Sequence, residues 1–232
     1  MELGARPWYT LGVYAKFLEQ SGVTGAEARR KIEEFLIRCE PTTNLVRWQN
    51  TIDAVTKYAT GKKLINIDGI AVTRAEMEWI QRAGSLAQQK LLFTMLCLAK
   101  YHEMLNDKNG GWINTDISDT FKMANIQLSR KRQGMLINTL LEKQYIELSR
   151  RVNNNNIKVL YPRIESETII VITDFRNIGN QYMNHIGGGY MMCAECGIVV
   201  KKTGNRHRYC KACAERINRM NTLANYRHIA QN

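Results

Sequence analysis

Two Cys-x-x-Cys pairs near the C-terminal end constrain this chain more than any other feature. The first pair is Cys193 and Cys196, the second is Cys210 and Cys213, and thirteen residues separate them. Four thiolates can hold one tetrahedral metal ion, and the loop between the pairs is short enough to close around it. The spacing therefore predicts a structural zinc site. A catalytic zinc site is not expected, because four cysteine ligands leave no position open for water.

The residues around the pairs refine this prediction. Gly197 directly follows the second cysteine, which suits a tight turn whose backbone amides point at thiolate sulfur. His207 is the rival ligand and ranks below the cysteines. Two thiol pairs with another role remain the alternative. The N-terminal residues lack the apolar core of a signal peptide, so we expect a reducing compartment, which favours zinc over disulfides.

The charge of the chain predicts an anionic partner. The formal net charge is +12, from 33 Lys and Arg against 21 Asp and Glu. Such an excess is typical of nucleic-acid binding, with solubility alone as the alternative. Residues 191–232 hold eight cations against two anions, and residues 85–160 hold eleven against six, so the basic character belongs to the middle and the tail. No apolar run of about eighteen residues occurs, so no membrane span is predicted.

Residues 1–83 are predicted to form a helical N-terminal region. Apolar residues recur at helical spacing in three stretches before residue 61. Trp8 and Trp48 are interpreted as core anchors of this bundle in preference to a ligand platform. Leu64–Ile67 and Ile70–Thr73 are predicted to pair as a hairpin that links the bundle to the next domain.

Residues 84–186 are predicted to form a winged-helix domain. An apolar helix at 85–105 precedes a short strand at 112–114, helices at 116–123 and 130–144, and strands at 145–149 and 157–161. This is the order of a winged helix, a variant of the helix-turn-helix. Thr168–Ile172 is β-branched throughout and is expected to add an extra strand to this sheet.

The third helix of that domain begins with three cations after Ser129. Positive side chains at a helix N-terminus oppose the macrodipole, so a compensating phosphate is expected there. A solvated basic face is the alternative, and winged helices also bind proteins. The predicted phosphate contacts of the helix and of the hairpin, or wing, are Arg130, Lys131, Arg132, Arg150, Arg151 and Lys158.

Residues 190–232 are predicted to form a zinc module with four cysteine ligands and a basic helix, joined to the body by a flexible Gly187–Gly189 segment. Its zinc-clipped loop and helix could grip phosphates, or the zinc could simply dock the tail on the body. The predicted phosphate contacts of this module are Lys201, Lys202, Arg206, Arg208, Arg216 and Arg219.

No enzyme signature is present. The chain contains no Walker loop, no His-Glu-x-x-His and no nucleophile elbow, and its four histidines have no evident cysteine or serine partner. We therefore predict a protein without catalytic activity.

The sequence resembles zinc-binding proteins of phages and mobile elements of Gram-positive bacteria. Arg6-Pro-Trp8, Leu64–Glu76, the winged-helix stretch, Asp174-Phe-Arg-Asn177 and the two cysteine pairs carry this resemblance. It implies that the four cysteines bind zinc and that the protein comes from a mobile element. Together with the expected reducing compartment, this origin predicts a location in the cytoplasm of the bacterial host cell.

The fold class expected is mostly α with small β elements. The expected function is non-catalytic nucleic-acid binding, with DNA favoured and RNA possible, in control of transcription or replication. The alternative is an adaptor that binds a protein or ribonucleoprotein, such as a phage inhibitor of a host defence complex. The net charge argues against mimicry of DNA, because mimics are acidic. The oligomeric state and the sequence bound are left open.

Overall fold

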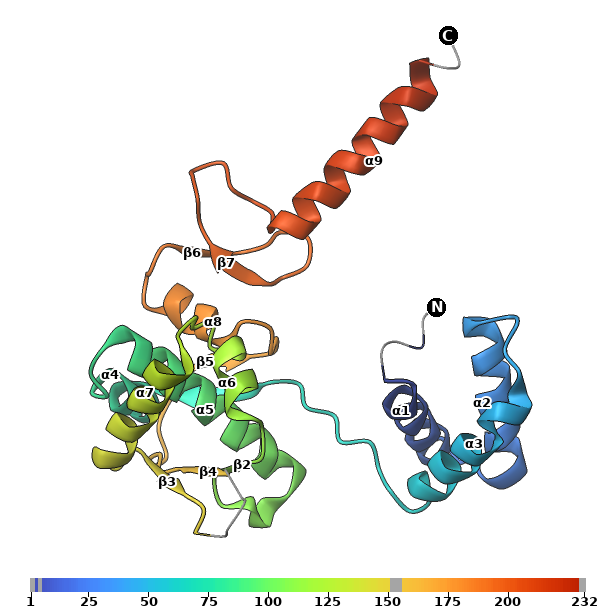
Figure 1. The fold of residues 1–232 in the computed structure, drawn as a ribbon, viewed down its shortest axis with the longest axis horizontal. Coiled ribbons are helices and arrows are strands. Elements are labelled where there is room, and N and C mark those ends of the chain that lie inside the picture. The colour runs from blue at the N-terminus through green and yellow to red at the C-terminus, as the bar shows by residue number, and fades with distance from the viewer. Residues whose placement is uncertain (1–2, 4–5, 151–155, 230–232) are drawn as a thin grey trace. The chain divides into compact units, whose positions relative to one another are not determined.

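The computed structural model describes residues 3, 6–150 and 156–229, with the backbone alone from 223 to 229. Arg151 therefore lies outside the described residues. The described chain is mostly helical with small antiparallel sheets, as the sequence predicts (Figure 1). It divides into two compact units, residues 1–66 and residues 67–232.

The first unit consists of three helices, α1 (Pro7–Gln20), α2 (Gly25–Cys39) and α3 (Leu45–Ala59). Proline at the first position of α1 is favourable, because its missing N–H would be unpaired there in any case. The three helices share one apolar core. Its buried residues are Leu11, Ala15, Leu18, Ala28, Ile32, Leu36, Ile52, Val55 and Ala59.

The two tryptophans of this unit differ in their environment. Trp48 packs against the core, as predicted. Trp8 does not belong to the core and is 40% exposed, so the prediction for Trp8 is wrong. Trp8 lies in the first turn of α1, where it packs on the exposed ring of Tyr58 near the end of α3.

The second unit is built around α5 (Leu86–Leu105). Every residue from Leu91 to Ala99 is buried, which fits a helix that is apolar on all sides. Its N-terminus is fixed by a capping box in which Ser85 and Gln88 exchange hydrogen bonds with each other's backbone. The neighbouring helices α4 (Arg74–Gln81), α6 (Ile117–Met123) and α8 (Ile178–His185) all pack against α5.

A three-stranded sheet lies next to α5. It contains β2 (Trp112–Ile113), β3 (Ile146–Leu148) and β4 (Ile157–Val159) in the antiparallel order β2-β4-β3. A 3-10 turn at Asp107–Asn109 precedes β2, and α7 (Arg130–Glu142) precedes β3. The helices and strands predicted between residues 85 and 161 are therefore present in the predicted order.

A second sheet corrects two predictions. β1 (Ile70–Thr73) pairs antiparallel with β5 (Thr168–Ile172), with Ile70 opposite Ile172. β1 does not form a hairpin with Leu64–Ile67, and β5 does not extend the three-stranded sheet. Two short strands that bury Ile70, Val72 and Ile172 stabilise each other although the chain between them is long.

This pairing also moves a domain boundary. Residues 67–83 belong to the second unit, because β1 and α4 bury their apolar residues in the same core as α5. The predicted boundary at 83/84 therefore lies too late in the chain.

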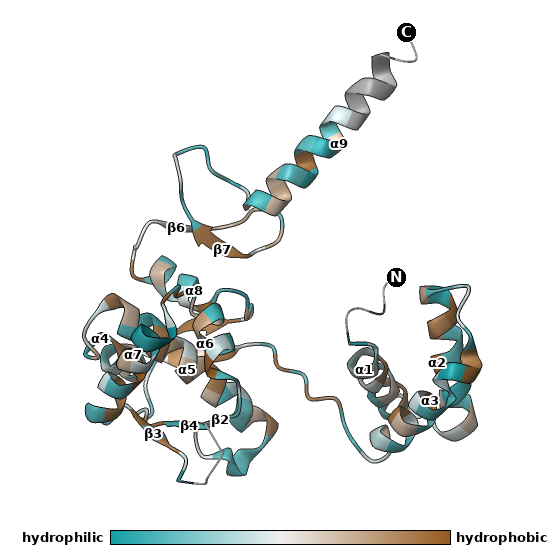
Figure 2. Cartoon of the chain, viewed as in Figure 1, coloured by the Kyte–Doolittle hydropathy of each residue, from teal (hydrophilic) through white to brown (hydrophobic). Residues whose placement is uncertain are grey.

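The C-terminal segment contains β6 (Tyr190–Met192), β7 (Val199–Lys201) and α9 (Lys211–Ile229). The loop between β7 and α9 is hydrophilic (Figure 2). The predicted separation of residues 190–232 from 84–186 is not seen, because both belong to the second unit and α8 packs on β6 and β7. Gly187–Gly189 is not a free joint, since Gly188 N donates to Met183 O at 2.7 Å and Lys202 N donates to Gly189 O at 2.9 Å.

Candidate metal centre

The first cysteine pair lies in the connection of a hairpin. β6 and β7 pair antiparallel, and Cys193 N donates to Ile198 O directly beyond the last strand pair. Gly197 N donates to Cys193 O, which closes a tight turn after Cys196. Gly197 has φ +74°, a left-handed conformation that only glycine adopts without strain. The glycine after the second cysteine therefore serves the turn that the sequence predicts.

The second pair lies where α9 begins. Cys210 immediately precedes the helix, Cys213 lies in its first turn, and Ala214 N donates to Cys210 O. Cys210 N also donates to the sulfur of Cys193 at 3.2 Å. The helix start and the hairpin turn are thus joined through a cysteine sulfur.

The four sulfurs form one cluster. Their ligand atoms all lie within 4.8 Å of one another, and the Sγ atoms of Cys196 and Cys210 are 3.8 Å apart. Four thiolates at about 2.3 Å from a central ion would stand about 3.8 Å from one another, so the cluster has the dimensions of a tetrahedral metal site. Cys196 is half-buried and the other three cysteines are buried. These four residues could hold a metal ion.

The environment of the sulfurs favours at least one thiolate. Burial opposes ionisation of Cys193, but the backbone amides of Cys210, Cys196 and Glu195 point at its sulfur and lower its pKa to about 6. Burial and the three neighbouring cysteine side chains raise the pKa of Cys213 to about 12. In such a pattern the first thiolate forms easily, and a cation is needed to hold further negative charge beside it.

Two arginines, one before and one after the four cysteines in the sequence, form hydrogen bonds with residues of the first cysteine pair. Arg216 donates to Glu195 Oε1 at 2.6 Å, and hydrogen bonds first to Glu195 and then to Cys213 raise its pKa. Arg176 donates to the backbone oxygen of Cys196 at 2.7 Å while it pairs with Asp174. Arg216 was predicted to contact phosphate, but in the structure it ties α9 to the first cysteine pair.

Nothing in the sequence connects the role of Arg176 with the cysteines. The opposite charges of Asp174 and Arg176, two residues apart, indicate only the local ion pair between them. His207, the rival ligand, does not join the cluster. Its ring nitrogens lie within hydrogen-bonding distance of Thr203 N, at 3.1 Å, and of Tyr209 O, at 2.7 Å.

The predicted cations of the third helix lie together at the start of α7. Arg130, Lys131 and Arg132 are all exposed, and among the described residues none of them forms an ion pair. Ser129 is the N-cap but makes no capping hydrogen bond through its side chain. The first-turn amides and the three cations are consequently not neutralised by any described side chain.

The remaining predicted cations fall into two groups. Lys158 on β4 faces Glu147 across the strand pair and lies 3.7 Å from its carboxylate, so its charge is partly neutralised. The others are exposed and form no ion pair among the described residues. They are Arg150 after β3, Lys201 at the end of β7, Lys202, Arg206 and Arg208 in the loop before α9, and Arg219 on α9.

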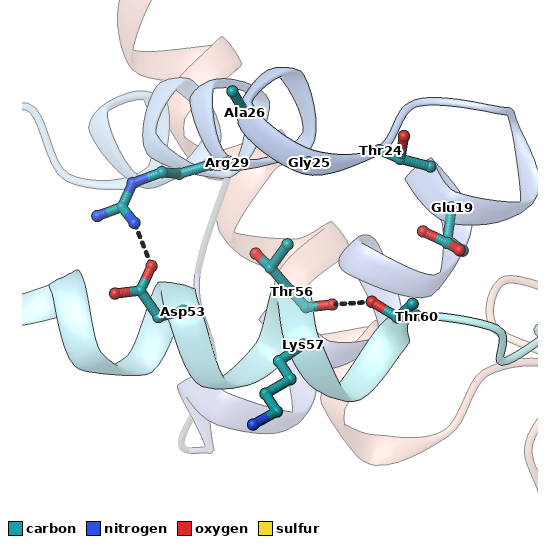
Figure 3. Close-up of a pocket in the computed structure, with 9 residues that line it drawn as sticks. All are labelled: Glu19, Thr24, Gly25, Ala26, Arg29, Asp53, Thr56, Lys57 and Thr60. Carbon is teal, nitrogen blue, oxygen red and sulfur yellow. Dashed lines mark hydrogen bonds and ion pairs between the residues drawn. The ribbon is translucent and has the colours of Figure 1, made fainter.

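A separate hollow lies in the first unit. It has a volume of about 720 Å³ and lies between the start of α2 and the last turns of α3, lined by Thr24, Arg29, Asp53 and Lys57 among others (Figure 3). Arg29 pairs with Asp53 across it and with Glu33 on its own helix. The hollow is open to solvent, and the charge of its arginine is neutralised by these two carboxylates.

Comparison of the chain with family models, with curated proteins and with solved structures finds no match. In the part of the chain that the structure describes, no helix has both the length and the apolar character that crossing a bilayer requires. The case for function therefore rests on the metal cluster and on the distribution of charge.

Proposed function

We propose that this chain is a non-catalytic nucleic-acid-binding protein, with DNA as the favoured ligand. In this proposal its central domain is a winged helix and its cysteine cluster binds Zn²⁺. The observation that carries the proposal is the triplet of exposed cations at the N-terminus of α7, none of which forms an ion pair with another described residue.

The assignment as a winged helix is supported by topology. The elements α5, β2, α6, α7, β3 and β4 follow one another in the order typical of that fold. The sheet order β2-β4-β3 makes β3 and β4 a hairpin, and the short β2 pairs with the inner strand. In such a domain α7 would enter a groove, and the β3–β4 hairpin would lie against an adjacent phosphate strand.

The choice of zinc is supported by the donor set. Four cysteine sulfurs within 4.8 Å of one another are typical of structural zinc, and soft thiolates disfavour the hard cations magnesium and calcium. Bound zinc would fix the hairpin turn to the first turn of α9. It would thereby hold the basic loop at 202–208 in one shape, which turns a flexible charged segment into a preorganised surface.

The reason to expect a phosphate at α7 is electrostatic. Arg130, Lys131 and Arg132 add positive charge where the helix dipole and the free amides are already positive. A phosphate would neutralise both contributions at once and accept hydrogen bonds from the amides. Arg150 and Lys158 would contribute from the hairpin. The cations of the loop at 202–208 would contribute from residues 190–229, which we call the metal module.

The biological setting that we propose follows the resemblance to proteins of phages and mobile elements. We propose that the chain controls transcription or replication of such an element in the bacterial cytoplasm, a role that DNA binding without catalysis can fulfil.

A salt titration of affinity tests the proposal. The logarithm of the binding constant should fall linearly with the logarithm of salt concentration, by about 0.9 for each phosphate contact. The double variant Lys131→Glu, Arg132→Glu should lower this slope by about 2. The charge-matched control Lys57→Glu, Lys108→Glu changes two exposed lysines elsewhere and should leave the slope nearly unchanged. Absence of salt-dependent binding to duplex or single-stranded nucleic acid would refute the proposal.

The alternative is an adaptor that binds a protein or ribonucleoprotein. One observation favours it: Met135, in the middle of α7, is 61% exposed and borders an apolar groove of about 380 Å³ with Leu128 and Leu136. Pull-down from host lysate with and without nuclease separates the two functions. A protein partner retained after nuclease treatment favours the adaptor, whereas loss of all partners favours nucleic-acid binding.

A further inference from the structure

The first unit exposes a group of aromatic rings that its fold does not require. Trp8 is 40% exposed, Tyr9 61% and Tyr58 38%. None of the three rings belongs to the apolar core of α1, α2 and α3. Trp8 contacts the other two rings instead. The centre of its ring lies 5.6 Å from the centre of the Tyr9 ring and 5.2 Å from that of the Tyr58 ring. We call these three residues the ring cluster.

Three cations lie over two rings of the ring cluster. The guanidinium carbon of Arg6 lies 5.9 Å from the centre of the Tyr9 ring. The Nζ atom of Lys16 lies 5.1 Å, and that of Lys62 3.5 Å, from the centre of the Tyr58 ring. Among the described residues, none of these three cations forms an ion pair with a carboxylate. The cations therefore rest on ring faces, a weaker partner at an exposed site than an anionic oxygen.

Exposed rings beside cations that no described carboxylate neutralises match one class of ligand. Single-stranded nucleic acid offers flat bases that stack on aromatic side chains and phosphates that pair with Lys and Arg. A duplex offers its phosphates but not its base faces, because the bases are already stacked on one another. An acidic protein would satisfy the cations but would leave the flat ring faces without a matching partner.

We propose that the ring cluster and its cations bind single-stranded nucleic acid. In this site Trp8 and Tyr9 stack on bases, while Arg6, Lys16 and Lys62 move from the ring faces to the phosphates. The site lies in residues 1–66, which the sequence had placed outside the basic part of the chain. It does not depend on the function proposed for α7, the β3–β4 hairpin or the metal module.

Two properties of the site explain why sequence patterns hide it. Residues 1–84 hold a nearly balanced number of cations and anions, so their net charge gives no signal. The aromatic residues at 8, 9 and 58 come from opposite ends of α1 and α3, and only the packing of these helices brings them together.

The test measures affinity of the full-length, metal-loaded chain for a fluorescein-labelled oligothymidylate and for a hairpin duplex. Trp8→Ala and Tyr9→Ala should each weaken binding to the single strand about tenfold, since loss of one stacking ring removes one base contact. Both variants should leave duplex binding within about twofold of the parent chain. Tyr9→Phe keeps the ring and should bind as the parent chain does.

Phe17→Ala is the matched control. Phe17 is 53% exposed on the same helix, but its ring stacks on Tyr14 and no cation lies over it among the described residues. It should have no effect on either ligand. Thermal unfolding of each variant verifies that the three-helix core remains intact.

Three outcomes overturn the inference. If Trp8→Ala and Tyr9→Ala both bind the single strand as tightly as the parent chain, the ring cluster does not bind single-stranded nucleic acid. It would then bind a protein partner or no partner. Equal losses on single strand and duplex would mean that the rings act without stacking on bases. A loss with Phe17→Ala as large as that with Tyr9→Ala would indicate a general apolar surface. Failure of the function proposed for α7 appears separately, as a duplex affinity that does not respond to the Lys131→Glu, Arg132→Glu variant.

Discussion

Asn180 is predicted to control how firmly the metal module is held on the body of the second unit. Its side chain is 3% exposed and lies near the start of α8. Asn180 Nδ2 donates to Val199 O on β7 at 3.0 Å, and Asn180 Oδ1 accepts from Asn125 Nδ2 at 2.9 Å. One amide thus bridges β7 of the metal module and the turn between α6 and α7.

The size of the effect follows from these two hydrogen bonds. In Asn180→Ala the buried carbonyl of Val199 loses its side-chain donor, which costs about 1–3 kcal/mol. The exposed Asn125 amide can turn to water, so loss of the second bond contributes only about 0.5 kcal/mol. We therefore expect the module to open more easily by about 2 kcal/mol, which is roughly thirtyfold in the opening equilibrium.

Hydrogen exchange measured peptide by peptide provides the assay. Amides of β6 and β7 should exchange about thirtyfold faster in Asn180→Ala, whereas amides of α1, α2 and α3 should not change. Asn184→Ala, an exposed asparagine on the same helix, is the matched control and should have no effect. If exchange of residues 190–201 rises less than about twofold, the reasoning that Asn180 docks the module is refuted.

Three further predictions concern the metal cluster and the core. Cys196→Ser should lose bound metal and unfold the first turn of α9, as measured by metal analysis and circular dichroism, whereas Cys39→Ser at the end of α2 should keep the metal. Glu76→Gln leaves Lys100 without its carboxylate, 2.8 Å away, and should lower the free energy of unfolding by about 3 kcal/mol in urea titrations. In Gly179→Ala the new methyl group would overlap a backbone carbonyl at the end of α6, so a loss of about 1–3 kcal/mol is expected. Gly134→Ala meets open space on α7 and should instead stabilise the chain by about 0.5–1 kcal/mol, and equal thermal shifts of the two glycine variants would contradict the packing argument.

The sequence by itself determined the features that depend on near neighbours. Two cysteines spaced three residues apart in a turn place their sulfurs close together, and the structure confirms that the sulfurs of the two pairs form one cluster. Helices were predictable for the same reason, because apolar periodicity and capping residues act within one or two turns. The capping box of Thr73 and Glu76 is such a local feature, because the two residues lie three positions apart at the start of α4.

Only the tertiary structure decided which distant segments meet. β1 could pair with the nearby Leu64–Ile67 or with the remote β5, and the shared core selected β5. It also drew residues 67–83 into the second unit. Likewise, only the fold pairs Arg216 with Glu195 and brings Trp8 beside Tyr58. The physical reason is that burial and charge pairing between distant residues depend on how whole elements pack, and no local pattern of the chain encodes that arrangement.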